Sequence, residues 1–326
     1  MKYLNCENLV TTNSATSAIH LALSMIKRLP VSDDWVGIED GDEVLTTPLT
    51  CTATNFPILA NNMNIKWVDI DLETCNLDMD NLENKLSEKT KVIMVVHWGG
   101  YPNDLDRIKE IQEKCLKLYG FRPRVIEDCA HGFGTKYKEE HFGNHENYCC
   151  YSFQAIKHLT TVDGGALVLP NEEEYKRAKL LRWYGIDRES NRKDFRCEED
   201  IPEWGFKFHM NDVNATIGLH NLKHIDKVIE RHKSNAAFYD QELSEVGGIK
   251  ILERSKDCDS SFWIYTLKVD RQDDFMKKMQ ECNIMVSRVH ERNDKHSCMS
   301  QYKTSLPNLE KIVKNMICIP AGWWVS

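Results

Sequence analysis

The sequence contains no long apolar run. In a chain of 326 residues the purely apolar stretches are short, such as Val92–Val96, whereas a membrane-spanning helix needs about 18 apolar residues or more. The N-terminal residues Met1–Glu7 also lack the apolar core of a signal peptide. We therefore expect a cytoplasmic protein that has no membrane partner.

Blocks of basic residues are also missing. The chain has 42 Lys and Arg against 50 Asp and Glu, which gives a formal net charge of −8. Proteins that bind nucleic acids or anionic membranes usually present a basic patch. The charge balance therefore predicts no nucleic-acid partner.

The cysteines follow no metal-binding pattern. There are 12, irregularly spaced and without a Cys-x-x-Cys pair, which speaks against a zinc ribbon and a thioredoxin-type site. Their share is well below the roughly 8–10% of a disulfide-rich scaffold. We expect mostly buried, reduced thiols and no metal site.

In the first half of the chain, short apolar segments alternate with segments of helical periodicity. Strands are predicted at Glu43–Thr46, Lys66–Ile70, Val92–His97, Arg124–Asp128 and Ala166–Leu169. Helices are predicted at Ser17–Leu29, Thr54–Ala60, Asp80–Leu86, Leu105–Tyr119 and Glu172–Tyr184. Because the strands are apolar throughout, a mostly parallel sheet covered on both faces is expected.

The second half is organised differently. The polar segment Arg188–Glu203 predicts a surface loop, and a long amphipathic segment runs from about Asn211 to Val246, ending at Gly247-Gly248. Beyond it, strands at Phe262–Val269 and Ile284–Val289 around a helix at Asp273–Glu281 predict a smaller α+β unit. We place the domain boundary near residue 225, which gives domains of residues 1–225 and 226–326.

Small hydroxyl residues open the first predicted helix, in Asn13–Ala18. The free N–H groups and the dipole of a helix start attract anions, and the Thr and Ser hydroxyls add donors. An ordinary helix cap is the alternative interpretation.

Two acids end the strand at Glu127-Asp128, and His131 follows three residues after the second acid. Ligands bind at the carboxyl ends of strands in open α/β sheets, and an acid there can hold a protonated ring nitrogen. A plain strand-end or capping acid fits the pattern equally well.

Lys157 lies among apolar and small residues, a few positions before Gly164-Gly165. Lysine is rarely buried without a partner, and burial lowers its pKa and favours the neutral amine that a Schiff base requires. A surface lysine with a buried stem is the alternative. Taken together in this order, a phosphate cradle, an acid and a lysine are the parts of a pyridoxal 5′-phosphate (PLP) site.

On these motifs the chain resembles the DegT/DnrJ/EryC1/StrS family of PLP-dependent nucleotide-sugar aminotransferases. The blocks that carry the resemblance follow the family's order through most of the chain: Gly41–Val44, Thr50–Thr54, Val68–Asp71, His97–Asp106, Glu127–His131, Ser152–Lys157, Phe208–Asp212 and Pro320–Trp324. The resemblance implies the α/β fold of type I PLP transferases (aspartate aminotransferase-like). Its large domain has a mostly parallel sheet, and its C-terminal domain is smaller and α+β.

The resemblance also implies roles for individual residues. Lys157 matches the catalytic lysine that forms the Schiff base with PLP and then shuttles a proton, and Asp128 matches the acid that pairs with the pyridinium nitrogen. Further cofactor-binding positions are the phosphate contacts Thr16, Ser17 and Ser152, His131 beside the ring, and Cys51, where the family commonly stacks an aromatic residue.

Other implied contacts involve the substrate and a second subunit. The family forms homodimers in which the partner completes the phosphate pocket, and His209 or Asn211 matches that contact. His290, Arg292 and His296 lie in the segment that faces the nucleotide sugar, where Arg292 would meet a diphosphate. A charged surface loop is the equal alternative there. Both termini are short for the family, which is expected to weaken the dimer.

The implied reaction moves an amino group from L-glutamate to a nucleotide-linked keto-deoxysugar. His131, at a position that is Gln or His in the family, favours C4 of a 4-keto-6-deoxysugar. One alternative is a non-catalytic PLP-fold protein with a binding or regulatory role, suggested by Cys51 and the short termini. Another is a PLP-dependent sugar dehydratase, although those relatives carry His in place of the lysine.

Overall fold

A seven-stranded sheet forms the centre of the protein, for which a computed structural model describes residues 3–189 and 200–325. The strand order is β1-β9-β8-β5-β4-β2-β3. The five strands from β8 to β3 are parallel, and β9 runs antiparallel to both of its neighbours. The bounds are β1 Leu9–Thr12, β2 Glu43–Thr46, β3 Asn64–Trp67, β4 Thr90–Val96, β5 Arg124–Asp128, β8 Tyr148–Ser152 and β9 Gly165–Val168. The predicted mostly parallel sheet is confirmed, although the sequence pattern did not identify β1 or β8 as strands.

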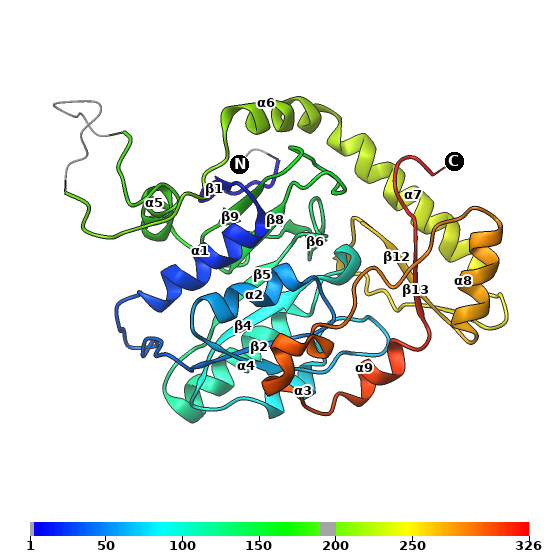
Figure 1. Cartoon of the computed structure of the whole chain (residues 1–326), viewed down its shortest axis with the longest axis horizontal. Helices are drawn as coiled ribbons and strands as arrows, with labels where there is room; N and C mark the ends of the chain where they lie inside the picture. Colours follow the sequence, from blue (N-terminus) through cyan, green and yellow to red (C-terminus); the bar gives the residue numbers. More distant parts are fainter. Residues whose placement is uncertain (1–2, 190–199, 326) are drawn as a thin grey trace.

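Helices cover both faces of this sheet. Every residue of β4 is buried; Val92 and Met94 belong to one apolar core, and Ile93 and Val95 to another. The first core includes residues of α1 (Ala15–Lys27), α2 (Thr52–Ala60) and α5 (Glu172–Leu181), and Figure 1 shows α1 and α2 across one face of the sheet. The second core includes residues of α3 (Met79–Asn84) and α4 (Leu105–Tyr119). Successive strand residues thus point to opposite faces of the sheet, and both faces are buried. For this reason the strand sequences are apolar throughout.

The C-terminal part has its own small antiparallel sheet, in the order β10-β12-β13. Its strands are β10 Ile249–Ile251, β12 Tyr265–Val269 and β13 Met316–Ile319, and α8 covers Gln272–Glu281. A separate short sheet, β11-β6-β7, joins the two halves, because β11 (Cys258–Asp259) pairs with β6 (Lys136–Tyr137), which pairs with β7 (Glu140–His141). The chain between β11 and β12 therefore lies beside the segments that follow β4 and β5, where Thr135 bonds to Ser261 and the Trp263 N–H to the Gly99 carbonyl.

The predicted amphipathic segment 211–246 is not one helix. It forms α6 (Asp212–Asn221), a 3-10 turn (η2, Leu222–His224) and α7 (Ile225–Leu243). The start of α7 packs in the second core through Ile225 and Ile229, and Ala236 packs in the core of the small sheet. The division at residue 225 stays a prediction, and the helix that begins there contributes to both cores.

One predicted strand does not form. Segment 284–289 makes a single isolated bridge, between Ser287 and Cys318. Left-handed backbone at Asn283 (φ 58°) and Val289 (φ 66°) interrupts the extended conformation at both ends. Strand β13 instead pairs with β12, and β12 starts only at Tyr265 because Phe262 is also left-handed (φ 49°).

The remaining elements are short. They are η1 Trp98–Gly100, η3 Asn293–Lys295, η4 Ser297–Tyr302 and α9 Pro307–Ile312. Most of the loop predicted at Arg188–Glu203 falls outside the described residues. Within residues 3–189 and 200–325, no helix has the length and apolar character required to cross a membrane.

Candidate active site

A cavity of about 260 Å³ lies where several strands of the large sheet end. Val96, Asp128 and Ser152 are the last residues of β4, β5 and β8, and all three line it. The carboxyl ends of parallel strands share one edge of a sheet, which is the usual place for a ligand in this fold class. The other lining residues are Ser14, Ala15, Thr16, Ile19, Thr50, Cys51, Ala53, Ala130, His131, Gln154, Ile156, Lys157, Asp163, Trp263 and His290.

Asp128 is held in one orientation at the edge of this cavity. Its Oδ2 accepts a hydrogen bond from the Thr54 hydroxyl at 2.6 Å, and its Oδ1 accepts one from the Ala130 N–H at 3.0 Å. The Thr54 hydroxyl in turn lies 2.8 Å from that of Thr50. The sequence patterns gave Thr54 no role, and its place in the block Thr50–Thr54 was the available signal. A carboxyl fixed in this way is suited to bind one ligand nitrogen.

Lys157 lies in the turn after β8 and reaches the same cavity. Burial disfavours its charged form and lowers the pKa of the amine to about 8, while Asp128 and Cys51 act in the opposite direction. With this pKa, about a tenth of the amine is neutral at pH 7 and about half at pH 8. This is the protonation state that a nucleophilic lysine needs.

The start of α1 reaches the cavity because a glycine permits it. Ser14 caps the helix by accepting a hydrogen bond from the Ser17 N–H at 3.0 Å, and Thr16 lines the cavity. A Cβ atom on Gly165 would lie 2.5 Å from the carbonyl carbon of Ser14, so this position of β9 accepts no side chain. Ser17 does not line the cavity, and its hydroxyl accepts a hydrogen bond from Ser14. The free N–H groups of the helix start make this end of the cavity an anion site.

His131 is buried beside the cavity as a neutral ring. Its Nδ1 accepts a hydrogen bond from the Gly99 N–H at 3.3 Å, so the proton of the neutral imidazole is on Nε2. Burial, aided by the nearby Lys157 amine, holds the pKa of His131 well below its usual range. The ring stacks on Trp263, with centroids 3.9 Å apart. Trp263 is a lining residue that the sequence patterns did not identify, because nothing in its neighbourhood marks it.

The C-terminal half contributes His290. Its segment is fastened to the loop before α2, because Asn293 Nδ2 donates to the Thr50 carbonyl at 2.7 Å and Asn55 Nδ2 donates to Asn293 Oδ1 at 2.8 Å. The His290 Nε2 is buried and has no hydrogen-bond partner within the described part of the chain. Burial lowers the pKa of this ring to about 4. An unpaired buried nitrogen that lines a cavity is a natural contact for a ligand.

Besides Ser17, three further predicted binding residues do not line this cavity. Arg292 is buried, and one edge of its guanidinium donates to Asp294, from Nε at 2.7 Å and from Nη2 at 2.5 Å. Its predicted contact with a diphosphate stays a prediction. His296 also lies outside, at the start of η4. Asn211 caps α6 by accepting from the Asn214 N–H and lines a different cavity, together with His209.

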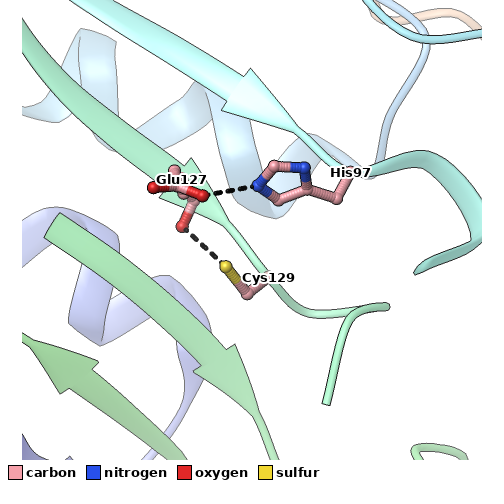
Figure 2. A group of neighbouring side chains, drawn as sticks. All are labelled: His97, Glu127 and Cys129. Atoms are coloured by element: carbon pink, nitrogen blue, oxygen red, sulfur yellow. Dashed lines mark hydrogen bonds and ion pairs between the residues drawn. The ribbon is translucent and has the colours of Figure 1, made fainter. Parts of the chain in front are cut away.

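Three residues of types that can bind metals lie together at the ends of β4 and β5 (Figure 2). His97 Nε2 and Glu127 Oε2 are 2.8 Å apart, and the Cys129 thiol donates to the Glu127 carbonyl oxygen. His97 Nδ1 accepts from the Asn103 N–H, and Asn147 donates to the second Glu127 oxygen. These hydrogen bonds occupy both ring nitrogens of His97 and both carboxylate oxygens of Glu127. We interpret the cluster as a structural network that anchors the strand carrying Asp128.

This network predicts an acid-dependent stability. Burial raises the pKa of Glu127, but hydrogen bonds from His97 and Asn147 outweigh it, so the pKa is lowered in the folded protein. The stabilisation is therefore complete above the unfolded value of about 4.3 and is lost as the pH falls through the lower folded value. In Glu127→Gln we expect the free energy of unfolding to fall by about 2 kcal/mol at pH 7. The urea midpoint of the variant should also change less between pH 3 and 5 than that of the unaltered protein. An unchanged pH profile in the variant would contradict the assignment.

The residues around the cavity fit PLP. The lysine amine and the fixed carboxyl are the groups that its aldehyde and its ring nitrogen require. A helix start with free N–H groups suits the phosphate, and the unpaired nitrogen of His290 is left for a further hydrogen bond. All of these groups lie around the same cavity.

Comparison with known proteins also supports a PLP site. Residues 1–324 match the sequence profile of the DegT/DnrJ/EryC1/StrS aminotransferase family. The crystal structure of AtS13 from Actinomadura melliaura is 47% identical, with a TM-score of 0.93 over 99% of this chain and 84% of AtS13. The sugar aminotransferase CalS13 from Micromonospora echinospora is 42% identical, with a TM-score of 0.92 over 100% of this chain and 85% of CalS13.

A curated relative adds the type of reaction. The UDP-4-amino-4-deoxy-L-arabinose–oxoglutarate aminotransferase of Shewanella sediminis is 29% identical over 87% of this chain and 71% of its own length. The family match over almost the whole chain, together with these relatives, establishes the enzyme class and the cofactor. The chain belongs to the DegT/DnrJ/EryC1/StrS aminotransferase family and is a PLP-dependent sugar aminotransferase.

Proposed function

We propose that the protein transfers an amino group from L-glutamate to C4 of a nucleotide-linked 4-keto-6-deoxysugar. The observation that carries the proposal is the single cavity that brings together the Lys157 amine, the Asp128 carboxyl and the start of α1. The choice of C4 and of a glutamate-type donor is supported by the name of the Shewanella relative, which specifies a 4-amino sugar and oxoglutarate. The resemblance at His131 supports C4 as well.

In this proposal each residue has a distinct task. PLP, when bound, supplies an electron sink for the reacting carbon. The Asp128 carboxyl accepts the hydrogen bond of the ring nitrogen and keeps the ring protonated. The start of α1 and the Ser152 hydroxyl hold the phosphate. The Lys157 amine, whose pKa is about 8, would carry a proton between the substrate carbon and a carbon of the cofactor.

A substrate panel tests this proposal. The purified protein is incubated with PLP, L-glutamate and a set of nucleotide-linked 3-keto and 4-keto deoxysugars, and product mass and 2-oxoglutarate release are followed. We expect one 4-keto sugar to gain an amino group, with one 2-oxoglutarate released for each product. Cofactor binding with no turnover on the whole panel would favour the non-catalytic alternative. A deoxygenated product without glutamate consumption would favour the dehydratase.

We further propose that the enzyme works as a homodimer. Four apolar side chains are exposed here: Ile156 lines the cavity, Val162 precedes the lining residue Asp163, and Val213 and Leu219 lie on α6. They form one region, because Asn221 Nδ2 donates to the Thr160 carbonyl at 2.9 Å and so fastens the end of α6 to the loop after Lys157. An exposed apolar patch at the rim of a site favours a protein contact. A second copy placed there would bring His209 or Asn211 toward its partner's phosphate site.

Charges in this patch are expected to separate the subunits. In Val213→Asp/Leu219→Asp, burying two carboxylates in an apolar contact is unfavourable, so light scattering after gel filtration should report a monomer. We also expect PLP affinity to fall about tenfold, equivalent to ~1.4 kcal/mol. The matched control is Leu118→Asp, which changes an exposed leucine of α4. A double variant that stays dimeric would contradict the proposed interface.

The proposed location is the cytoplasm. Each cysteine in residues 3–189 and 200–325 is a free thiol, and most are buried. Free thiols are typical of a reducing compartment. This supports the proposal of a cytoplasmic enzyme.

A further inference from the structure

We propose that Trp263 is a positioning residue whose indole keeps water away from the ε-amino group of Lys157 and thereby keeps that amine ready to react. The inference rests on the proposed function in one respect, namely that Lys157 is the reactive amine. It concerns a residue outside every motif described above.

The chain fixes Trp263 rigidly. Its N–H donates to the Gly99 carbonyl at 2.9 Å, and its indole Nε1–H donates to the Ile156 carbonyl at 2.8 Å. The indole is therefore bonded to the residue directly before Lys157. With both the backbone and the ring held, the side chain of Trp263 has little freedom to leave the cavity wall.

The indole ring covers the amine. The Lys157 Nζ lies 3.5 Å from the ring centroid, and the same indole stacks against His131. Trp263 itself is only 9% exposed. A flat apolar surface at this distance leaves no room for a water molecule between the ring and the amine. The π electrons of the same ring attract the charged form and so act against the exclusion of water.

The other groups around Lys157 do not replace this effect. Asp128 at the end of β5 and Cys51 before α2 both favour the charged amine. His131, His158 and His290 disfavour it only when they are themselves protonated, and burial lowers the pKa of each of them. At neutral pH these histidines are uncharged, so exclusion of water is the effect that remains to favour the neutral amine.

The test measures Lys157 in the protein without cofactor. The rate of acetylation of Lys157 by acetic anhydride is followed by peptide mass spectrometry from pH 6 to 11, which gives the apparent pKa of this one amine. We expect a value of about 8 in the unaltered protein. In Trp263→Leu water reaches the amine, so the pKa should rise by about one unit and acetylation at pH 7 should fall about tenfold.

The control is Trp204→Leu, which removes another indole that lies over a cation, in this case Arg28. It should leave the Lys157 profile unchanged. Trp263→Phe keeps an apolar ring but loses the bond to Ile156, and should stay within about half a unit of the unaltered protein. If Trp263→Leu does not fold, as judged by circular dichroism, Trp263→Met replaces it with the same expectation.

The results distinguish failure of this inference from failure of the proposed function. An unchanged pKa in the Leu or Met variant, or a fall, overturns the inference, because a fall would mean that the ring chiefly stabilises the charged amine. Failure of the proposed function gives a different result: PLP would not form a borohydride-stable link to Lys157 in the unaltered protein. The acetylation profile needs no cofactor and would still decide the role of Trp263.

Discussion

Replacing Lys157 with alanine should abolish amino transfer. The variant loses the amine that bonds to the cofactor and also the base that moves the proton, so kcat should fall by more than about 10⁴-fold. The absorbance of the PLP-loaded protein should lose the visible band that depends on the lysine. Steady-state 2-oxoglutarate release and the absorption spectrum measure the two effects.

Two further variants make this result specific. Lys157→Arg keeps a positive charge but has no amine that can react, so it should be as inactive as the alanine variant. Lys176→Ala removes an exposed lysine of α5 that pairs with Glu172 on its own helix, and should retain activity. Turnover by Lys157→Ala close to that of the unaltered protein would refute the assignment of this residue.

Asp128→Asn should produce the second large loss. The amide keeps the shape of the side chain and its contact with Thr54, but it carries no charge to hold a protonated ring nitrogen. We expect kcat to fall about 10³-fold, equivalent to ~4 kcal/mol of transition-state stabilisation. Asp128→Glu retains the charge at a displaced position and should recover part of this loss.

The matched control for this variant is Asp106→Asn. Asp106 is an exposed carboxylate that pairs with Lys138 on the surface, so the same chemical change there should leave kcat unaltered. Thermal unfolding of both variants checks that neither loss comes from misfolding. Equal kcat values for Asp128→Asn and Asp106→Asn would show that the Asp128 charge has no catalytic task.

These predictions concern residues that the sequence could identify. Each local pattern alone left a plain structural alternative open for Lys157 and Asp128, and their order within the family's motif blocks identified both. The continuously apolar strands, such as β4, predicted a sheet covered on both faces. Patterns of this kind depend on neighbours in the chain, so a sequence displays them directly.

Local patterns failed where the conformation depends on distant contacts. Segment 284–289 has the composition of a strand, yet left-handed backbone at Asn283 and Val289 limits it to one bridge, between Ser287 and Cys318 on the outer edge of β13. For Arg292, the structure adds an ion pair of Nε and Nη2 with Asp294, two residues along the chain.

The sequence by itself therefore determined the fold class, the family and the chemical groups of the site. Only the tertiary structure decided how those groups meet. Thr54 orients Asp128, and Trp263 covers Lys157. His290 comes from the C-terminal half, and the Asn293 side chain holds its segment against Thr50. The physical reason is distance along the chain. Hydrogen bonds and ring contacts act over a few ångströms, and between residues far apart in sequence they exist only once the chain has folded.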